Sequence, residues 1–112
     1  MELIKKSELS VSNFDGYQMI DSIIKERKGH LIKIGKAIIE PGTRIPDDGK
    51  TVHDADEYSY IIKGTLMSGT NSDTTTIGAG DFSFIPAGEK HWCENIQNEN
   101  CELIWFMIKK EK

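Results

Sequence analysis

The sequence predicts an all-β fold, and three features of its pattern lead to that conclusion. Short runs rich in β-branched and aromatic residues recur along the chain. Turn residues, mainly Gly, Pro, Asn and Asp, separate these runs at regular intervals. No stretch of ordinary helix length has an apolar period of 3.6 residues. Many short strands with such turns are typical of a β-sandwich or a β-barrel.

The N-terminal half is predicted to form an edge segment and two long strands. Residues 1–16 are polar and mixed and end in a turn signal, so we expect them to lie across a sheet edge. Residues 17–25 and 30–40 are rich in Ile and predict two strands joined at Lys28-Gly29. Gly35 interrupts the second strand, where it predicts a bulge or bend. Residues 41–52, with two Pro and two Gly, predict a loop without strand.

The C-terminal half continues the series of strands. Residues 53–63 alternate with period two, which would place His53 and Glu57 on one strand face with the small Ala55 between them. A hairpin is expected from 66–68 and 74–77. The last strand, 101–108, is apolar on both faces, so we expect both faces to be buried or covered.

Length and charge limit the organisation of the chain and its partners. Its 112 residues fit a single domain, 1–112. The formal net charge is −4 and basic residues are scattered, so we expect no nucleic-acid partner. No apolar run approaches bilayer length and no signal-peptide pattern is present, so we expect no membrane partner and a cytoplasmic location. Cys93 and Cys101 are accordingly expected to be reduced thiols.

The stretch 80–95, GDFSFIPAGEKHWCEN, organises the rest of the chain. Apolar residues 82–85 predict a strand that Pro86 and Gly88 end in a tight turn. His91 then opens the returning strand, and alternation puts His91, Cys93 and Asn95 on one face. We interpret Asn95 as a structural residue at the strand end.

The spacing of Gly80, Pro86, Gly88, His91 and Asn95 matches the second sequence motif of the cupin superfamily at every position. The region 41–64 resembles the first cupin motif less completely. Its stretch HDADEYSYIIKG carries a His and a Glu at the expected spacing, but the family's usual His-x-His pair would begin at position 51, where this chain has a threonine. The resemblance implies a small RmlC-like cupin, a double-stranded β-helix or jelly-roll barrel.

The resemblance also implies a metal site inside the barrel. His53, Glu57 and His91 would form a set of two imidazoles and one carboxylate, which can hold Fe, Mn, Ni, Zn or Co and leave open positions. A fourth ligand could come from Cys93 or from an aspartate of the preceding loop. Each of the three residues also has a purely structural interpretation, as a hydrogen-bonded or exposed side chain. An inert, packed thiol is the ordinary role of a buried cysteine such as Cys93.

Three functions are compatible with these motifs. The first is a metal-dependent oxygenase, isomerase or lyase acting on a small acid or sugar derivative. The second is a non-catalytic barrel that binds a small molecule, and the third is a metal-free dimeric interaction module. The motifs leave enzyme and binder open. The resemblance implies a homodimer, and Tyr58, Tyr60 and Trp92 are the aromatic residues expected on a covered outer face.

Overall fold

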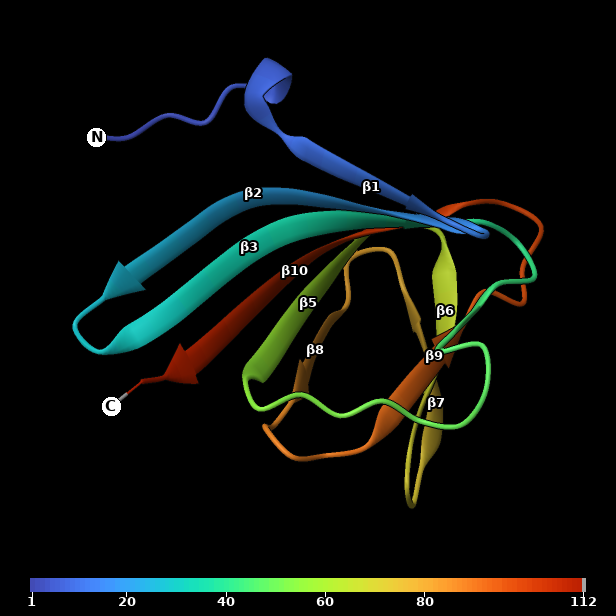
Figure 1. Ribbon diagram of the computed structural model, residues 1–112. Helices are drawn as coiled ribbons and strands as arrows, with labels where there is room; N and C mark the ends of the chain where they lie inside the picture. The colour runs from blue at the N-terminus through green and yellow to red at the C-terminus, as the bar shows by residue number, and fades with distance from the viewer. Residues whose placement is uncertain (112) are drawn as a thin grey trace.

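Two antiparallel β-sheets make up the fold in the computed structural model, which describes residues 1–111 (Figure 1). One sheet has six strands in the order β1-β2-β3-β10-β5-β8, and the other has four in the order β4-β9-β6-β7. The strands are β1 (Ser10–Phe14), β2 (Tyr17–Arg27), β3 (His30–Ile39), β4 (Arg44–Ile45), β5 (Asp56–Lys63), β6 (Thr65–Thr70), β7 (Thr74–Gly78), β8 (Phe82–Ile85), β9 (His91–Glu94) and β10 (Cys101–Lys110). This arrangement is consistent with a jelly roll and confirms the predicted all-β class.

Most predicted strands lie where the sequence places them. The β2–β3 hairpin turns at Lys28 and Gly29, which both have positive φ, as a tight hairpin turn requires. Strand β1 forms the outer edge of the six-stranded sheet, as expected for the N-terminal segment. A bulge in β2 falls directly beside Gly35, between Asp21 and Ile23, so the predicted irregularity is present on the neighbouring strand.

Three predictions about the middle of the chain were wrong. The loop 41–52 contains a short strand, β4, and Thr51 forms a bridge with His91, because β9 offers an unpaired edge there. His53 precedes β5, which begins only at Asp56, so alternation along a strand does not explain its position. The strand opened by His91 does not return beside β8. Strand β8 pairs with β5 and β9 pairs with β6, so residues 86–90 cross from one sheet to the other.

The hydrophobic core lies between the sheets. Strand β10 is central, between β3 and β5, and the inward side chains of its first half, Cys101, Leu103 and Trp105, are buried. Trp105 packs over Gly35, where a Cβ would lie 2.3 Å from the ring. The buried apolar residues of the core are Ala37, Ile39, Ile61, Leu66, Cys101, Leu103 and Trp105.

The outward face of β10, which the sequence predicted to be buried or covered, is partly exposed in a single copy of the chain. Ile104 is 41% exposed. The second sheet covers the inner side of β10, but nothing within residues 1–111 covers its outer side. Both cysteines are free thiols, as expected. No helix in the described residues is long and apolar enough to cross a membrane.

Candidate metal centre

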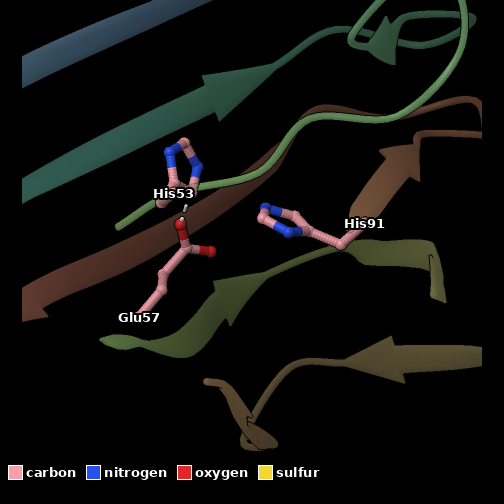
Figure 2. Close-up of side chains that lie close together, drawn as sticks. All are labelled: His53, Glu57 and His91. Atoms are coloured by element: carbon pink, nitrogen blue, oxygen red, sulfur yellow. Dashed lines mark ion pairs between the residues drawn. The ribbon is translucent and has the colours of Figure 1, made fainter. Parts of the chain in front are cut away.

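The three residues predicted as ligands converge at one end of the space between the sheets. One donor atom from each of His53, Glu57 and His91 lies within 4.8 Å of the other two. Figure 2 shows the two imidazoles and the carboxylate directed toward one another from three separate segments. The Nε2 atom of His53 is 3.5 Å from Oε1 of Glu57, and the two imidazole centroids are 5.0 Å apart.

Each ligand has a different local origin. Glu57 is on β5 and points inward, with its side chain 16% exposed. His91 is the first residue of β9 and is buried. His53 comes from the loop before β5, and its side chain is 35% exposed. The site therefore has a buried end at His91 and an open end at His53.

Backbone hydrogen bonds tie the two motif regions together around this site. The N–H groups of Thr51 and His91 each donate to the carbonyl oxygen of the other at 2.9 Å. Gly88 N–H donates to the carbonyl oxygen of His53 at 2.8 Å. Ala87 N–H donates to Oδ1 of Asp56 at 2.9 Å. These bonds fix the loop that carries His53 against the turn that precedes His91.

The orientation of His91 suits a metal ligand. Its Nδ1 lies 2.9 Å from the carbonyl oxygen of Glu89. Because a carbonyl oxygen can only accept, this hydrogen bond puts the proton on Nδ1 and leaves the Nε2 lone pair free. Metal-binding histidines commonly donate the N–H of their other ring nitrogen to such an oxygen atom.

The donor types suit a first-row divalent ion, and the donor atoms lie near the spacing that such an ion needs. Such ions bind nitrogen and oxygen at about 2.0–2.2 Å, so at tetrahedral angles two donors on one ion lie about 3.4 Å apart. The three donor atoms here lie within 4.8 Å of one another, so side-chain rotation would have to draw them together around an ion. Two nitrogens and one oxygen form a borderline set that suits the first-row divalent ions.

The alternatives for a fourth ligand do not join this group. Neither Cys93 nor a loop aspartate belongs to the cluster in residues 1–111. Burial, together with the Glu57 carboxylate, raises the pKa of the Cys93 thiol to about 12, so it remains a protonated, packed thiol at neutral pH. Asn95 is fully buried and donates to the carbonyl oxygens of Ile39 and Glu99, which supports a structural role.

Sequence reasoning missed the charged residues around the open end. Lys33 and Lys109 line a pocket of about 210 Å³ next to His53. Lys109 Nζ forms an ion pair with Asp54 Oδ2 at 2.8 Å. These lysines lie outside both motifs in sequence. Their only signal in the sequence is strand alternation, and that signal can be used only once the inward face of each strand is known.

A two-sheet barrel with an inward His, Glu and His defines a cupin-type protein. The sequence profile of the cupin domain matches residues 35–107, and the chain belongs to this family. No curated protein matches the chain in sequence.

Similar folds occur in proteins of different kinds. An RmlC-like cupin from Shewanella frigidimarina superposes with a TM-score of 0.76 at 14% identity, covering 100% of this chain and 95% of that one. A predicted oxalate decarboxylase from Thermotoga maritima gives 0.72 at 23% identity, covering 96% and 99%. Drosophila melanogaster CENP-C, in its structure bound to CAL1, gives 0.76 at 14% identity, covering 94% and 84%. These likenesses concern the fold alone.

Proposed function

We propose that this cupin binds a divalent metal ion through His53, Glu57 and His91, and a small organic molecule in the adjacent pocket. The observation that carries the proposal is the convergence of three donor atoms within 4.8 Å from segments far apart in sequence. The Glu57 carboxylate is partly buried between two imidazoles, and a cation bound there would compensate its negative charge. The orientation of His91 by the Glu89 carbonyl oxygen adds support.

A divalent ion with three protein ligands supplies open positions and Lewis-acid character toward an oxygen atom of a bound ligand. The protein's own residues would control access of water and ligand to the ion. His91 and Glu57 shield the inner side of the site from water, while the exposed edge at His53 gives access from the pocket. This arrangement suits an oxygenase, isomerase or lyase, and equally a binder without turnover. A screen for turnover of small acids and sugar derivatives separates these two cases.

Metal analysis of the purified protein tests the proposal. Wild type prepared without chelators should contain close to one equivalent of a divalent metal. His91→Ala should lose most of it while the circular dichroism spectrum remains all-β. His30→Ala is the matched control, because His30 Nδ1 lies 3.2 Å from the carbonyl oxygen of Lys28 and His30 joins no donor cluster in residues 1–111. Full metal content in His91→Ala would show that the ligand assignment is wrong.

We also propose that the chain forms a homodimer through an exposed aromatic face. We define the outer aromatic face as the outward side chains of β8, β5 and β10, namely Tyr58, Tyr60, Phe82, Phe84, Ile104 and Phe106. Three ring pairs lie 4.6–5.9 Å apart across it: Tyr58 with Phe84, Tyr58 with Phe106, and Tyr60 with Phe82. Trp92 does not belong to this face, because β9 is in the other sheet. There Trp92 covers Gly69 and meets the guanidinium of Arg44 4.7 Å from the ring centroid.

Area and charge both support a second copy of this chain as the partner. Tyr58, Phe82 and Phe84 are 41%, 79% and 52% exposed. With about 200 Å² for each aromatic side chain and a smaller share from Ile104, the face presents on the order of 400 Å² of apolar surface. That is about half of what each partner buries in a standard interface. Lys36 and Glu102 pair at 2.9 Å beside the face, so these two charges compensate each other within one copy.

Analytical ultracentrifugation tests this assembly. Wild type should sediment as a dimer at micromolar concentration, and Phe82→Glu should sediment as a monomer that remains folded. Ile96→Glu is the control, since Ile96 is 52% exposed but lies in the loop after β9. A monomeric wild type would refute the dimer and leave the metal proposal untouched.

A further inference from the structure

Lys33 stands on the inner face of the barrel, at its open end. On β3 it pairs with Met107 of β10, and Met107 pairs in turn with Glu57 of β5. Side chains of paired residues in antiparallel strands share a face of the sheet. Lys33 therefore lies on the same face as the candidate ligand Glu57. Two strand spacings of about 4.8 Å separate their backbones by about 10 Å.

The pocket between these residues has the size of a small organic molecule. Its volume is about 210 Å³, and His53 is the one candidate ligand among its lining residues, so the pocket adjoins the exposed edge of the candidate metal centre. At about 30 Å³ for each water molecule, it holds about seven waters. The lining residues are Leu31, Lys33, His53, Asp54, Ala55, Met107 and Lys109.

The charges in the pocket leave one lysine uncompensated. Lys109 is paired with Asp54, with Nζ 2.8 Å from Oδ2. Lys33 takes part in no ion pair within residues 1–111. A divalent ion beside Glu57 would add further net positive charge. Lys33 is exposed and free to turn toward a ligand, so a ligand with negative charge at the end facing β3 would gain a charge-assisted contact there.

We propose that the pocket selects small hydroxy or keto carboxylic acids, with Lys33 as the residue that binds the carboxylate. This inference rests on the proposed metal centre for the ligand's second contact, an oxygen donor at the opposite end. Lys33 acts as a specificity-determining residue, because a carboxylate is held by a charge-assisted hydrogen bond that a neutral hydroxymethyl group cannot replace. Because Lys109 is paired with Asp54, Lys33 is the unpaired lysine available to a carboxylate at this side.

Calorimetric titration with matched acids and alcohols tests the selection. The probes are glycolate with ethylene glycol, malate with 1,2,4-butanetriol, and galacturonate with galactose, each titrated into metal-loaded protein. At least one acid should bind tenfold or more tightly than its neutral counterpart, and Lys33→Met should remove that difference. Lys36→Met, on the outer face of the same strand, should behave as wild type. If no acid binds wild type more tightly than its neutral counterpart, the proposal is wrong.

A second variant tests the same charge balance by adding positive charge to the pocket instead of removing it. Asp54→Asn releases Lys109 from its ion pair and adds a second free positive charge to the pocket. Acid binding should therefore become at least threefold tighter, with the gain diminishing at high salt because exposed charges are screened. Unchanged or weaker acid binding in Asp54→Asn would contradict the assigned charge balance.

Failure of this inference is distinguishable from failure of the metal centre. Metal content is measured first on wild type and on Lys33→Met, which should be equal because Lys33 is outside the donor cluster. If both load metal but acid binding does not depend on Lys33, the carboxylate contact is refuted and the metal centre stands. If neither loads metal, the metal proposal fails, and titration of metal-free protein then decides whether Lys33 alone distinguishes acids from alcohols.

Discussion

Thr51 and His91 form a reciprocal backbone pair, in which each N–H donates to the other's carbonyl oxygen at 2.9 Å. In an antiparallel bridge of this type the two Cα atoms are about 5.5 Å apart and both side chains lie on the same face. Thr51 therefore stands beside the buried His91 on its site-facing side. This is also the position at which the family's first histidine would occur.

Thr51→His should add a ligand to the candidate metal centre. An imidazole at position 51 would replace a water on the ion, and we expect metal affinity to rise at least tenfold, about 1.4 kcal/mol. The gain should decrease below about pH 6.5, because only neutral imidazole binds a metal. The measurement is titration of one divalent metal into both proteins.

Val52→His is the control for this prediction. Val52 is the next residue along the chain, makes no bridge to β9 and is 51% exposed. Its substitution should leave metal affinity unchanged. Equal affinities of folded wild type and Thr51→His would show that position 51 does not reach the ion.

Gly35→Ala should destabilise the fold. A Cβ at position 35 would lie 2.3 Å from the Trp105 ring and 2.5 Å from the carbonyl oxygen of Ile20. Overpacking of this kind costs about 1–3 kcal/mol, which urea unfolding would measure. Gly78→Ala is the control, because its nearest atom beyond the adjoining residues, Thr65 Oγ1, is at 3.5 Å, an ordinary contact. Equal stability of the two variants would contradict the close packing of Trp105 on β3.

Strand pattern and turn residues were sufficient to predict the class of fold and most strands. The β2–β3 hairpin, for example, follows from Ile-rich runs around Lys28-Gly29. The pairing of strands that are distant in the sequence was harder to predict. Residues 82–85 and 91–94 read as neighbours because a Pro-x-Gly turn separates them, yet they pair in different sheets. A local turn signal records where a strand ends, and the partner of the next strand depends on long-range packing.

The candidate site was predictable where a motif specified it. His53, Glu57 and His91 converge as expected, although His53 does so from a loop held by Gly88 rather than by strand alternation. Lys33 was not predictable, because its place in the pocket depends on the register of β3 against β10. That register is fixed by packing of the whole sheet, which no local motif encodes.

The two thiols should be unreactive in the native protein. Burial raises the pKa of Cys101 to about 11 and that of Cys93 to about 12, so thiolate is scarce at pH 8. A thiol reagent at pH 8 should label fewer than one cysteine in the native state and two after denaturation. Rapid native labelling of both thiols would contradict this burial.

Because of these raised thiol pKa values, the free energy of unfolding should decrease at high pH. In the unfolded chain a thiol ionises near pH 8.5–9, below its folded pKa. The stabilising contribution is therefore complete below about pH 8.5 and is lost as pH rises toward 11–12. Urea unfolding of wild type and of Cys101→Ala at pH 7.5 and pH 10 should show a smaller pH-dependent loss in the variant. An identical loss of stability in both proteins would contradict a contribution of the Cys101 thiol to this pH dependence.

Asn95 should be required for stability rather than for metal binding. Its Nδ2 donates to the carbonyl oxygens of Ile39 and Glu99 at 2.9 and 2.8 Å, and its Oδ1 accepts from Gln97 N–H at 3.0 Å. Asn95→Ala removes both donors from a fully buried position, which should lower the free energy of unfolding by about 2–4 kcal/mol. Metal content per folded molecule should not change.

Asn95→Asp separates this hydrogen-bonding role from a loss of packing. The substitution keeps the shape of the side chain but directs a carboxylate at two carbonyl oxygens, so the folded state should favour the protonated acid and raise its pKa. The defect relative to wild type should then be largest at pH 7 and become smaller as pH falls toward 4, because a protonated carboxyl can donate one hydrogen bond. Urea unfolding of both proteins across this range measures it. A defect that stays constant with pH would show that the carbonyl oxygens of Ile39 and Glu99 do not depend on the Asn95 donors.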